Sequence, residues 1–447
     1  MKTQLNVGFI TTVSGRWPRE TSIARRAKYE EYLKTTYPQY NIVGFDNYID
    51  NNDDLYKAVE TFKANDVDVI VYLYGSFSGD DFGTILSEEM NHTPIILWAL
   101  QEPELGGGRL LSNALVSATM NSASIKRLGG VCYFVFGDET DARVEKELTD
   151  IFMSYNIAKN MKRTFLGLLG YRPTAFYNCA FDEGLIRRVF GVRMEETDLK
   201  IIFDKMEKYS DAEIAAEIAT ITTEIDKNLP EGYIENHARL IMAVREVFEE
   251  TGYDYATLKC WPEMGALKTT PCAVIGRLAD EGKHIMCEGD VDAGLAYMVE
   301  NIITNQPSFV TDMININEEA NTFTFWHCGN AAPSLVCPSC KPVMGDHPLA
   351  GQGTALRATL KEGAVTFARF CNIGGVYKLF IASGEAVKTD MYTPGSMVNV
   401  KIKTPVREAI YKITDNEVPH HYSVVWADVA SEMKAYAKLL GMEIIEI

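Results

Sequence analysis

The chain lacks long hydrophobic runs. No segment of its 447 residues approaches the roughly 18–20 consecutive apolar residues that a membrane-spanning helix needs. The apolar stretch nearest the start, Val7–Ile10, is too short for the core of a signal peptide and has no small-residue cleavage site. We therefore expect no membrane contact and a cytoplasmic location.

Positive charge is scarce as well. The chain has 43 Lys and Arg against 61 Asp and Glu, for a net charge of −18. Such a chain is repelled by phosphate backbones and anionic lipids, so nucleic acid is not an expected partner. Its nine cysteines are odd in number and mostly lie in apolar contexts, as reduced thiols do in cytoplasmic enzymes.

Two kinds of common motif are missing. No glycine-rich loop matches the dinucleotide fingerprint or the phosphate loop, which argues against a nucleotide site. Only one Cys-x-x-Cys pair is present, formed by Cys337 and Cys340, and Cys328 is the one extra thiol close to it in sequence. Half a zinc site or a redox pair is therefore a minor alternative, and the role of the pair stays open.

Apolar strands alternate with amphipathic helices through the first two thirds of the chain. Continuous apolar strands of this kind are typical of parallel sheets covered on both faces. From about Ser308 the segments become strand-like and are separated by Gly and Pro. We predict an α/β protein with two Rossmann-like parallel-sheet domains, followed by a β-rich, antiparallel, barrel-like domain. The expected domains are 1–162, 163–305 and 306–447.

In the expected second domain, two predicted strands are each followed by an acidic residue. Tyr255–Cys260 leads to Glu263, and His284–Cys287 leads to Asp290, with helical spacing over Pro271–Asp280 between them. Parallel strands of one sheet place their carboxyl ends on the same side. We therefore expect Glu263 and Asp290 to meet, where they either hold a divalent cation or share acid–base work.

Three histidines of the β-rich region sit at strand ends, where side chains face loop-lined cavities. His327 ends one strand, and His420 and His421 precede another. Two carboxylates with one or two imidazoles suit Mn²⁺, Mg²⁺ or Co²⁺ better than structural zinc. Glu288 is an alternative ligand or a supporting group, and Asp292 is expected to cap the helix that follows.

The order of these segments resembles the L-fucose isomerase and L-arabinose isomerase superfamily. The similar motifs are Gly8–Glu20, Lys259–Glu263, Glu288–Asp290 and His420–Ser423. Glu288-Gly289-Asp290 is similar to the Glu-Asn-Asp of L-fucose isomerases, with Gly in place of Asn. The departures from the family pattern affect the expected sugar more than the expected reaction.

The resemblance implies an aldose–ketose isomerase that works through a cis-enediol. It implies metal binding by Glu263, Asp290 and His421, most simply of Mn²⁺, with Glu263 and Asp290 also moving the proton. His327 is either a fourth ligand or a substrate contact. Arg16 and Trp17 would contact the sugar from a neighbouring subunit of a homo-oligomer, a hexamer or trimer with sites at subunit junctions.

Three rival functions stay open on the sequence. The same scaffold could isomerise a modified sugar, such as a sulfonated or phosphorylated one, with Arg16, Arg19 or Lys341 near its tail. A non-catalytic sugar-binding protein is the second alternative. The third is a structural zinc protein built on Cys328, Cys337 and Cys340. L-fucose, D-arabinose, L-arabinose and a modified hexose all stay open as the sugar.

Overall fold

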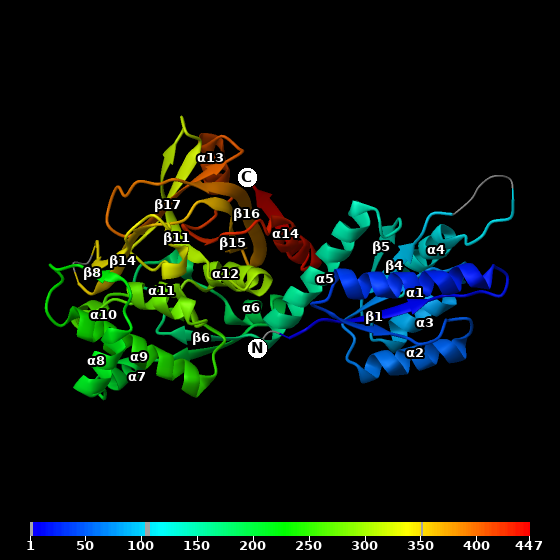
Figure 1. Cartoon of the computed structure of the whole chain (residues 1–447), viewed down its shortest axis with the longest axis horizontal. Helices are drawn as coiled ribbons and strands as arrows, with labels where there is room; N and C mark the ends of the chain where they lie inside the picture. Colours follow the sequence, from blue (N-terminus) through cyan, green and yellow to red (C-terminus); the bar gives the residue numbers. More distant parts are fainter. Residues whose placement is uncertain (1–2, 103–107, 350–351) are drawn as a thin grey trace. The chain divides into compact units, whose positions relative to one another are not determined.

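The structure is a computed structural model that describes residues 3–102, 108–349 and 352–447 (Figure 1). The chain divides into two compact units, Met1–Lys159 and Asn160–Ile447. Helix α5 (Ala142–Arg163) runs across the boundary between them. Among the described residues, no helix is long and apolar enough to cross a membrane.

The N-terminal unit is a five-stranded parallel sheet with strand order β2-β1-β3-β4-β5. Its strands are β1 (Asn6–Thr11), β2 (Asn41–Gly44), β3 (Val69–Leu73), β4 (Ile95–Ala99) and β5 (Cys132–Phe136). Its other helices are α1 (Arg19–Thr36), α2 (Asn52–Ala64), α3 (Asp81–Glu89) and α4 (Ala114–Arg127). Alternate side chains of the wholly buried β3 enter two separate cores, one on each face of the sheet. That arrangement explains why β3 is apolar throughout.

The C-terminal unit begins with a four-stranded parallel sheet of order β10-β9-β6-β7. Its strands are β6 (Phe165–Leu169), β7 (Arg193–Thr197), β9 (Tyr255–Leu258) and β10 (His284–Cys287). The helices around it are α6 (Glu183–Val189), α7 (Leu199–Met206), α8 (Asp211–Ala219), α9 (Tyr233–Thr251), α10 (Glu263–Ala266), α11 (Cys272–Asp280) and α12 (Val291–Thr304), with a short 3-10 turn, η1 (Tyr177–Cys179). Leu258 pairs with Cys287, so β9 and β10 do end side by side, as predicted.

The rest of the unit is a ten-stranded, mostly antiparallel sheet that closes on itself where β16 pairs with β17. Its strands are β8 (Glu224–Ile225), β11 (Phe309–Asn317), β12 (Thr322–His327), β13 (Val343–Asp346), β14 (Thr354–Thr359), β15 (Gly363–Ile373), β16 (Val376–Val387), β17 (Ser396–Ile402), β18 (His421–Val425) and β19 (Glu443–Glu446). A 3-10 turn, η2 (Pro333–Leu335), and helices α13 (Val406–Asp415) and α14 (Ala430–Leu439) accompany it. Aromatic side chains such as Phe323 and Phe367 fill the barrel core. The predicted fold class, parallel α/β sheets followed by an antiparallel barrel, is confirmed.

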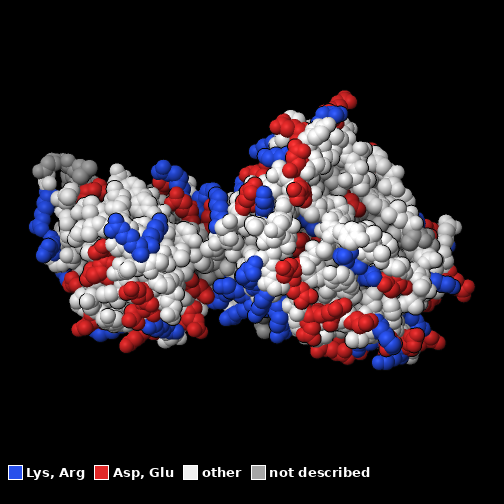
Figure 2. Space-filling view, turned by 180° about the vertical axis from the view of Figure 1, so that it is seen from behind, with Lys and Arg blue, Asp and Glu red and all other residues white. Residues whose placement is uncertain are grey.

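Surface charge is mixed on the face shown in Figure 2, where Asp and Glu are spread over each unit with Lys and Arg among them. Several surface charges form ion pairs, including Lys200 with Asp204 and Arg407 with Glu318. Exposed pairs of this kind contribute little to stability, because water and salt screen them. The burial of the cores and of a few internal polar groups is therefore what positions the site.

Helix α12 connects the parallel sheet to the barrel and is buried almost along its whole length. Asp290 is its N-cap residue and accepts a hydrogen bond from the Ala293 amide at 3.1 Å. The prediction that Asp292 caps this helix is wrong, because the Asp292 carboxylate instead accepts a hydrogen bond from the Tyr377 hydroxyl at 2.8 Å. The cap is therefore made by the residue at the sheet edge.

Glu300 of α12 gives a test of this packing. Its carboxyl group is completely buried and accepts a hydrogen bond from Ser423, and burial raises the pKa of Glu300 to about 8. A carboxyl whose pKa is raised by folding stabilises the native state below its unfolded pKa, and that contribution is lost as the pH rises through the folded pKa.

We expect the free energy of unfolding of the wild-type protein to fall as the pH rises from about 5 to about 9. This fall should exceed that of Glu300→Gln by a few kcal/mol, since one pKa unit corresponds to about 1.4 kcal/mol. Urea unfolding at a series of pH values measures this difference. Parallel pH profiles for the two proteins would contradict the assignment.

Candidate active site

A cavity of about 680 Å³ lies within the C-terminal unit, where residues following β9 and β10 face barrel strands. Aromatic side chains form part of its wall: Phe176, Trp261 and Trp326. Four thiols form another part: Cys260, Cys272, Cys287 and Cys328. Burial raises the pKa of Cys272 well above its usual value, so this thiol stays protonated. The wall is therefore largely apolar, and a small set of polar groups stands out against it.

The turn between β10 and α12 aims one carboxylate into this cavity. Glu288 and Gly289 both have left-handed backbones, with φ of +60° and +65°. A side chain at position 289 would place its Cβ 2.5 Å from the carbonyl oxygen of Tyr171, so only glycine fits there. The turn leaves Glu288 lining the cavity and lets Asp290 begin α12.

Glu288 meets His421 at the polar end of the cavity. The Nε2 atom of His421, at the start of β18, lies 3.4 Å from a carboxylate oxygen of Glu288. Burial alone would raise the pKa of Glu288, but hydrogen bonding to His421 and the charge of nearby imidazoles lower it to about 2. Burial would lower the pKa of His421, yet hydrogen bonds to Asp290, Cys179 and Glu288 hold it well above its usual value. The two groups therefore form a carboxylate–imidazolium pair when no other cation is present.

His327, at the end of β12, lies beside this pair. Ligand atoms of Glu288, His327 and His421 all lie within 4.8 Å of one another. The Nδ1 atom of His327 accepts a hydrogen bond from the Cys328 amide at 2.9 Å, which leaves the proton of the neutral ring on Nε2. That buried Nε2 has no hydrogen-bond partner and faces the cavity region, so His327 is suited to donate to a bound ligand.

Asp290 is surrounded by hydrogen-bond donors. Its two oxygens accept from the Arg369 guanidinium at 2.8 and 3.0 Å, and both side chains are completely buried. It also accepts from the Nδ1 atom of His421 at 2.9 Å and from the Cys179 thiol at 3.5 Å. The Arg369 charge and the His421 hydrogen bond outweigh burial and hold the pKa of Asp290 far below its usual range. Because Nδ1 of His421 donates to Asp290, the lone pair of the neutral ring is on Nε2, toward the cavity.

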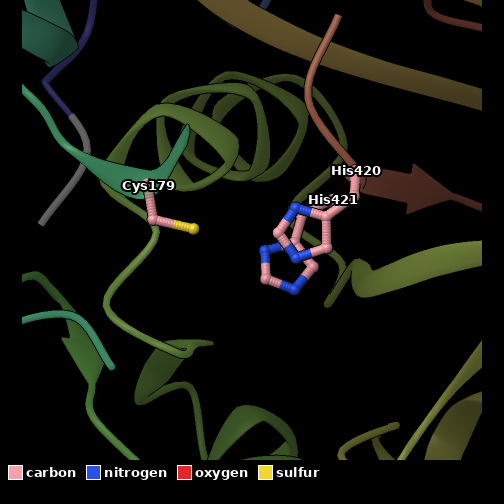
Figure 3. A group of neighbouring side chains, drawn as sticks. All are labelled: Cys179, His420 and His421. Carbon is pink, nitrogen blue, oxygen red and sulfur yellow. The ribbon is translucent and has the colours of Figure 1, made fainter. Parts of the chain in front are cut away.

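Figure 3 shows the back of this arrangement, where the Cys179 thiol is directed toward the His420 and His421 rings. The centroids of the two rings lie 3.8 Å apart, and their planes are tilted by 32°. Burial raises the pKa of Cys179, which keeps its thiol protonated as a donor to Asp290. Within this second group of potential ligands, Cys179 and His421 are linked through Asp290, whereas His420 is hydrogen-bonded to Asn178.

The structure does not bring every predicted residue to this point. Glu263 begins α10 and pairs with Lys259 at 2.5 Å, and it does not line the cavity, although Trp261 and Pro262 do. Of the neighbouring carboxylates the geometry favours Glu288 as a ligand, because Asp290 is already saturated with donors. The proposed metal and proton-transfer roles of Glu263 and Asp290 stay predictions.

Arg16 and Trp17 lie in the N-terminal unit, on the loop after β1, where the Trp17 ring is 6.3 Å from that of Phe77. Their contact with a sugar stays a prediction. Cys337 and Cys340 are partly exposed thiols that form no disulfide. Cys337 is hydrogen-bonded to the Ser339 hydroxyl, and Cys340 to the Thr359 hydroxyl.

Two functional candidates escaped the sequence analysis. Arg369 stands in the apolar strand β15, and Asp312 stands in β11, beside His421 in the sheet register. A charged residue inside a strand that otherwise packs in a core is the signal that could have identified Arg369. For Asp312 the signal is weaker, because β11 is only partly buried from Asp312 onward, and a charged residue is ordinary there.

Comparison with known proteins bears on the whole chain. Residues 325–447 match the family model described as L-fucose isomerase, C-terminal domain. A sulfoquinovose isomerase from Alkalicoccus urumqiensis is 27% identical over 383 residues, which cover 85% of this chain and 86% of the relative. One from Priestia megaterium is 24% identical over 421 residues, 94% of each chain. A third, from Clostridium sp. (strain MSTE9), is 27% identical over 360 residues, 78% of this chain and 80% of the relative.

The buried ion pair gives the test of this site. We expect Asp290→Asn to lower the free energy of unfolding by about 3–5 kcal/mol, because it leaves the Arg369 charge buried without a partner. Urea unfolding measures the loss. The double variant Asp290→Asn/Arg369→Met should recover much of it, since a pair replaced by apolar groups is far less costly than a broken pair.

Glu288→Gln is the matched control for that measurement, because this carboxylate lines the cavity and has no guanidinium partner. Its unfolding free energy should change by much less than that of Asp290→Asn. Equal losses for the two variants would show that Asp290 and Arg369 do not anchor the site.

Proposed function

Since the chain belongs to the L-fucose isomerase family, we propose that it interconverts a sulfonated aldose of the sulfoquinovose type and the corresponding ketose. The predicted reaction class, aldose–ketose isomerisation, is confirmed by these relatives. The names of the relatives favour the modified-sugar alternative over L-fucose, D-arabinose or L-arabinose. A cytoplasmic location is kept as part of the proposal.

The observation that carries the proposal is the polar end of the cavity. Two buried atoms, Nε2 of His327 and one oxygen of Asp312, converge there without hydrogen-bond partners, beside the Nε2 atom of His421, which pairs with Glu288 at 3.4 Å. Leaving such groups unpaired is costly unless a ligand satisfies them. A non-catalytic sugar-binding site has no need for an ionised Glu288 beside two imidazoles, whereas an isomerase does.

The donor set fits a divalent cation, for which we propose Mn²⁺. Glu288 and Nε2 of His421 would hold it, because both are directed to one point and His421 is fixed from behind by Asp290. A bound divalent cation would act as a Lewis acid on the two sugar oxygens between which the carbonyl moves. In the absence of that cation, the proton on His421 balances the Glu288 charge.

The remaining polar and aromatic groups would bind and orient the sugar. His327 would donate its Nε2 hydrogen to a sugar oxygen, as predicted for a substrate contact. Trp261, Phe176 and Trp326 would cover the open-chain sugar and exclude water, which strengthens polar interactions inside the site. Arg369, through Asp290, would keep His421 in place during turnover.

The sulfonate needs a separate partner. Among the described residues that line the cavity there is no Lys or Arg. We propose that the protein is a homo-oligomer and that Arg16, with Trp17, reaches the sulfonate from a neighbouring subunit. This proposal supplies the positive charge that a sulfonated sugar requires and that the cavity wall lacks.

Substrate preference tests the proposed function. With Mn²⁺ added to chelator-treated protein, we expect sulfoquinovose to be isomerised with a kcat/KM about 10- to 100-fold above that for D-glucose, L-fucose or the arabinoses. A hydrogen-bonded contact to a charged group contributes about 1.5–3 kcal/mol, which corresponds to that range. Ketose formation is measured by NMR or chromatography. Turnover of L-fucose above that of sulfoquinovose would overturn the sulfonated-sugar assignment.

Metal binding is tested separately from turnover. Glu288→Gln should weaken Mn²⁺ binding at least about tenfold, because a neutral amide replaces an anionic ligand. Titration calorimetry or Mn²⁺ electron paramagnetic resonance measures the affinity. Glu235→Gln, on the exposed side of α9, is the matched control and should bind Mn²⁺ as the wild type does. Unchanged affinity in Glu288→Gln would place the cation elsewhere.

A further inference from the structure

Isomerisation of an aldose requires a group that takes a proton from C2 and returns it to C1. A carboxylate can do this only if it reaches the cavity and is not consumed by other interactions. Asp290 is saturated with donors, Glu263 is paired with Lys259 outside the cavity lining, and Glu288 is the carboxylate that faces His421. Among the described residues that line the cavity, Asp312 is the remaining carboxylate.

The fold places Asp312 beside the polar end of the cavity. In the register of the sheet, β11 lies between β18 and β12, and Asp312 pairs with His421 on one side and with Trp326 on the other. One oxygen of Asp312 lies 3.6 Å from Nε2 of His421. The same oxygen lies 3.9 Å from Nε2 of His420. It is therefore close to the proposed cation site from a strand different from the turn that carries Glu288.

That oxygen is buried and has no hydrogen-bond partner, although the side chain as a whole is 29% exposed. Asp312 is thus reachable from the cavity while one oxygen is shielded from bulk water. Burying an unsatisfied carboxylate oxygen in a central strand costs stability, and a bound ligand at the cavity would offset that cost. It differs in this respect from Asp290, whose oxygens are fully paired.

We propose that Asp312 is the catalytic base of the isomerisation, an inference that rests on the function proposed above. Its carboxylate takes the proton from C2. The electron pair of the C2–H bond forms the C1–C2 double bond, and the carbonyl pair moves onto O1. The protonated carboxyl then returns its proton to C1, while the proton of O2 passes to O1 and the C2–O2 double bond forms. The atoms and electrons of the aldose and ketose balance, and Asp312 is restored.

His420 lies beside Asp312 without a hydrogen bond to it. Its Nδ1 atom lies 2.7 Å from the side-chain amide nitrogen of Asn178. Because the amide donates this hydrogen bond, Nδ1 accepts it, and the proton of the neutral ring is on Nε2. That nitrogen faces Asp312 across 3.9 Å, beyond hydrogen-bond distance. The ring therefore limits the space on one side of Asp312 without occupying its lone pairs, and the carboxylate stays open toward the cavity.

Asp312→Asn tests the proposal, because it removes the base with almost no change of shape. We expect kcat for the best aldose to fall about 10²- to 10⁴-fold, the usual contribution of a general base. Solvent deuterium should no longer enter the recovered aldose at C2. The Mn²⁺ affinity should stay within about threefold of the wild-type value, because Asp312 is not a ligand in this scheme.

Two further variants keep the result interpretable. Asp428→Asn, on the exposed loop after β18, is the matched control and should keep wild-type turnover and exchange. Asp312→Glu retains a carboxylate and should recover part of the activity that Asp312→Asn loses. Thermal unfolding of each variant shows that the fold is kept.

The outcomes separate this inference from the proposed function. Near wild-type turnover or C2 exchange in Asp312→Asn would overturn the inference alone. Loss of Mn²⁺ binding together with activity would make Asp312 a ligand instead, and would also overturn it. A wild-type protein that converts no aldose, sulfonated or not, would remove the proposed function and this inference with it.

Discussion

The buried ion pair between Asp290 and Arg369 is the interaction on which the site depends. It joins the N-terminus of α12 to strand β15, and Asp290 also holds Nδ1 of His421. Removing two charges from water is costly, and only the number and geometry of their hydrogen bonds offset that cost. The pair therefore contributes little net stability. Its main effect is to fix which atom of His421 faces the cavity, since a ring held by a carboxylate at Nδ1 must present Nε2 on its other side.

In this arrangement three consecutive residues have different positions, one facing the cavity and one facing the interior. Glu288 faces the cavity, Gly289 turns the chain, and Asp290 faces the interior. An aspartate held by a guanidinium, an imidazole, a thiol and a backbone amide is poorly placed to accept a further cation. The polar end of the cavity is thus assembled from three separate elements, the turn after β10 and the strands β11 and β18, with the end of β12 beside them. The closed barrel keeps those strands in register.

The sequence predicted the architecture well because strand and helix patterns are local. The apolar runs ending near Glu263 and Asp290 do form adjacent parallel strands, and the strand ending at His327 was placed correctly. The direction in which a strand-end carboxylate points is not local. It depends on the left-handed backbone of two residues, Glu288 and Gly289. Glutamate rarely adopts a positive φ, so the sequence does not predict this conformation at position 288. The roles of Arg369 and Asp312 depend on contacts between strands far apart in the sequence. Arg369 donates a hydrogen bond to the backbone carbonyl of His421, 52 residues away. Asp312 pairs in the sheet register with His421, more than a hundred residues away.

The glycine at position 289 also has a consequence for how related sequences can diverge. L-fucose isomerases resemble this chain at a Glu-Asn-Asp segment, but here a Cβ at the middle position would meet the Tyr171 carbonyl at 2.5 Å. An Asn could enter only if the loop after β6 moved away at the same time. A side chain at position 289 therefore requires a shift of the backbone at Tyr171, whatever residue stands there, whereas a substitution of Tyr171 leaves its carbonyl in place. The conformation of the turn after β10 is thus tied to that of the loop after β6, and the direction of Glu288 depends on both.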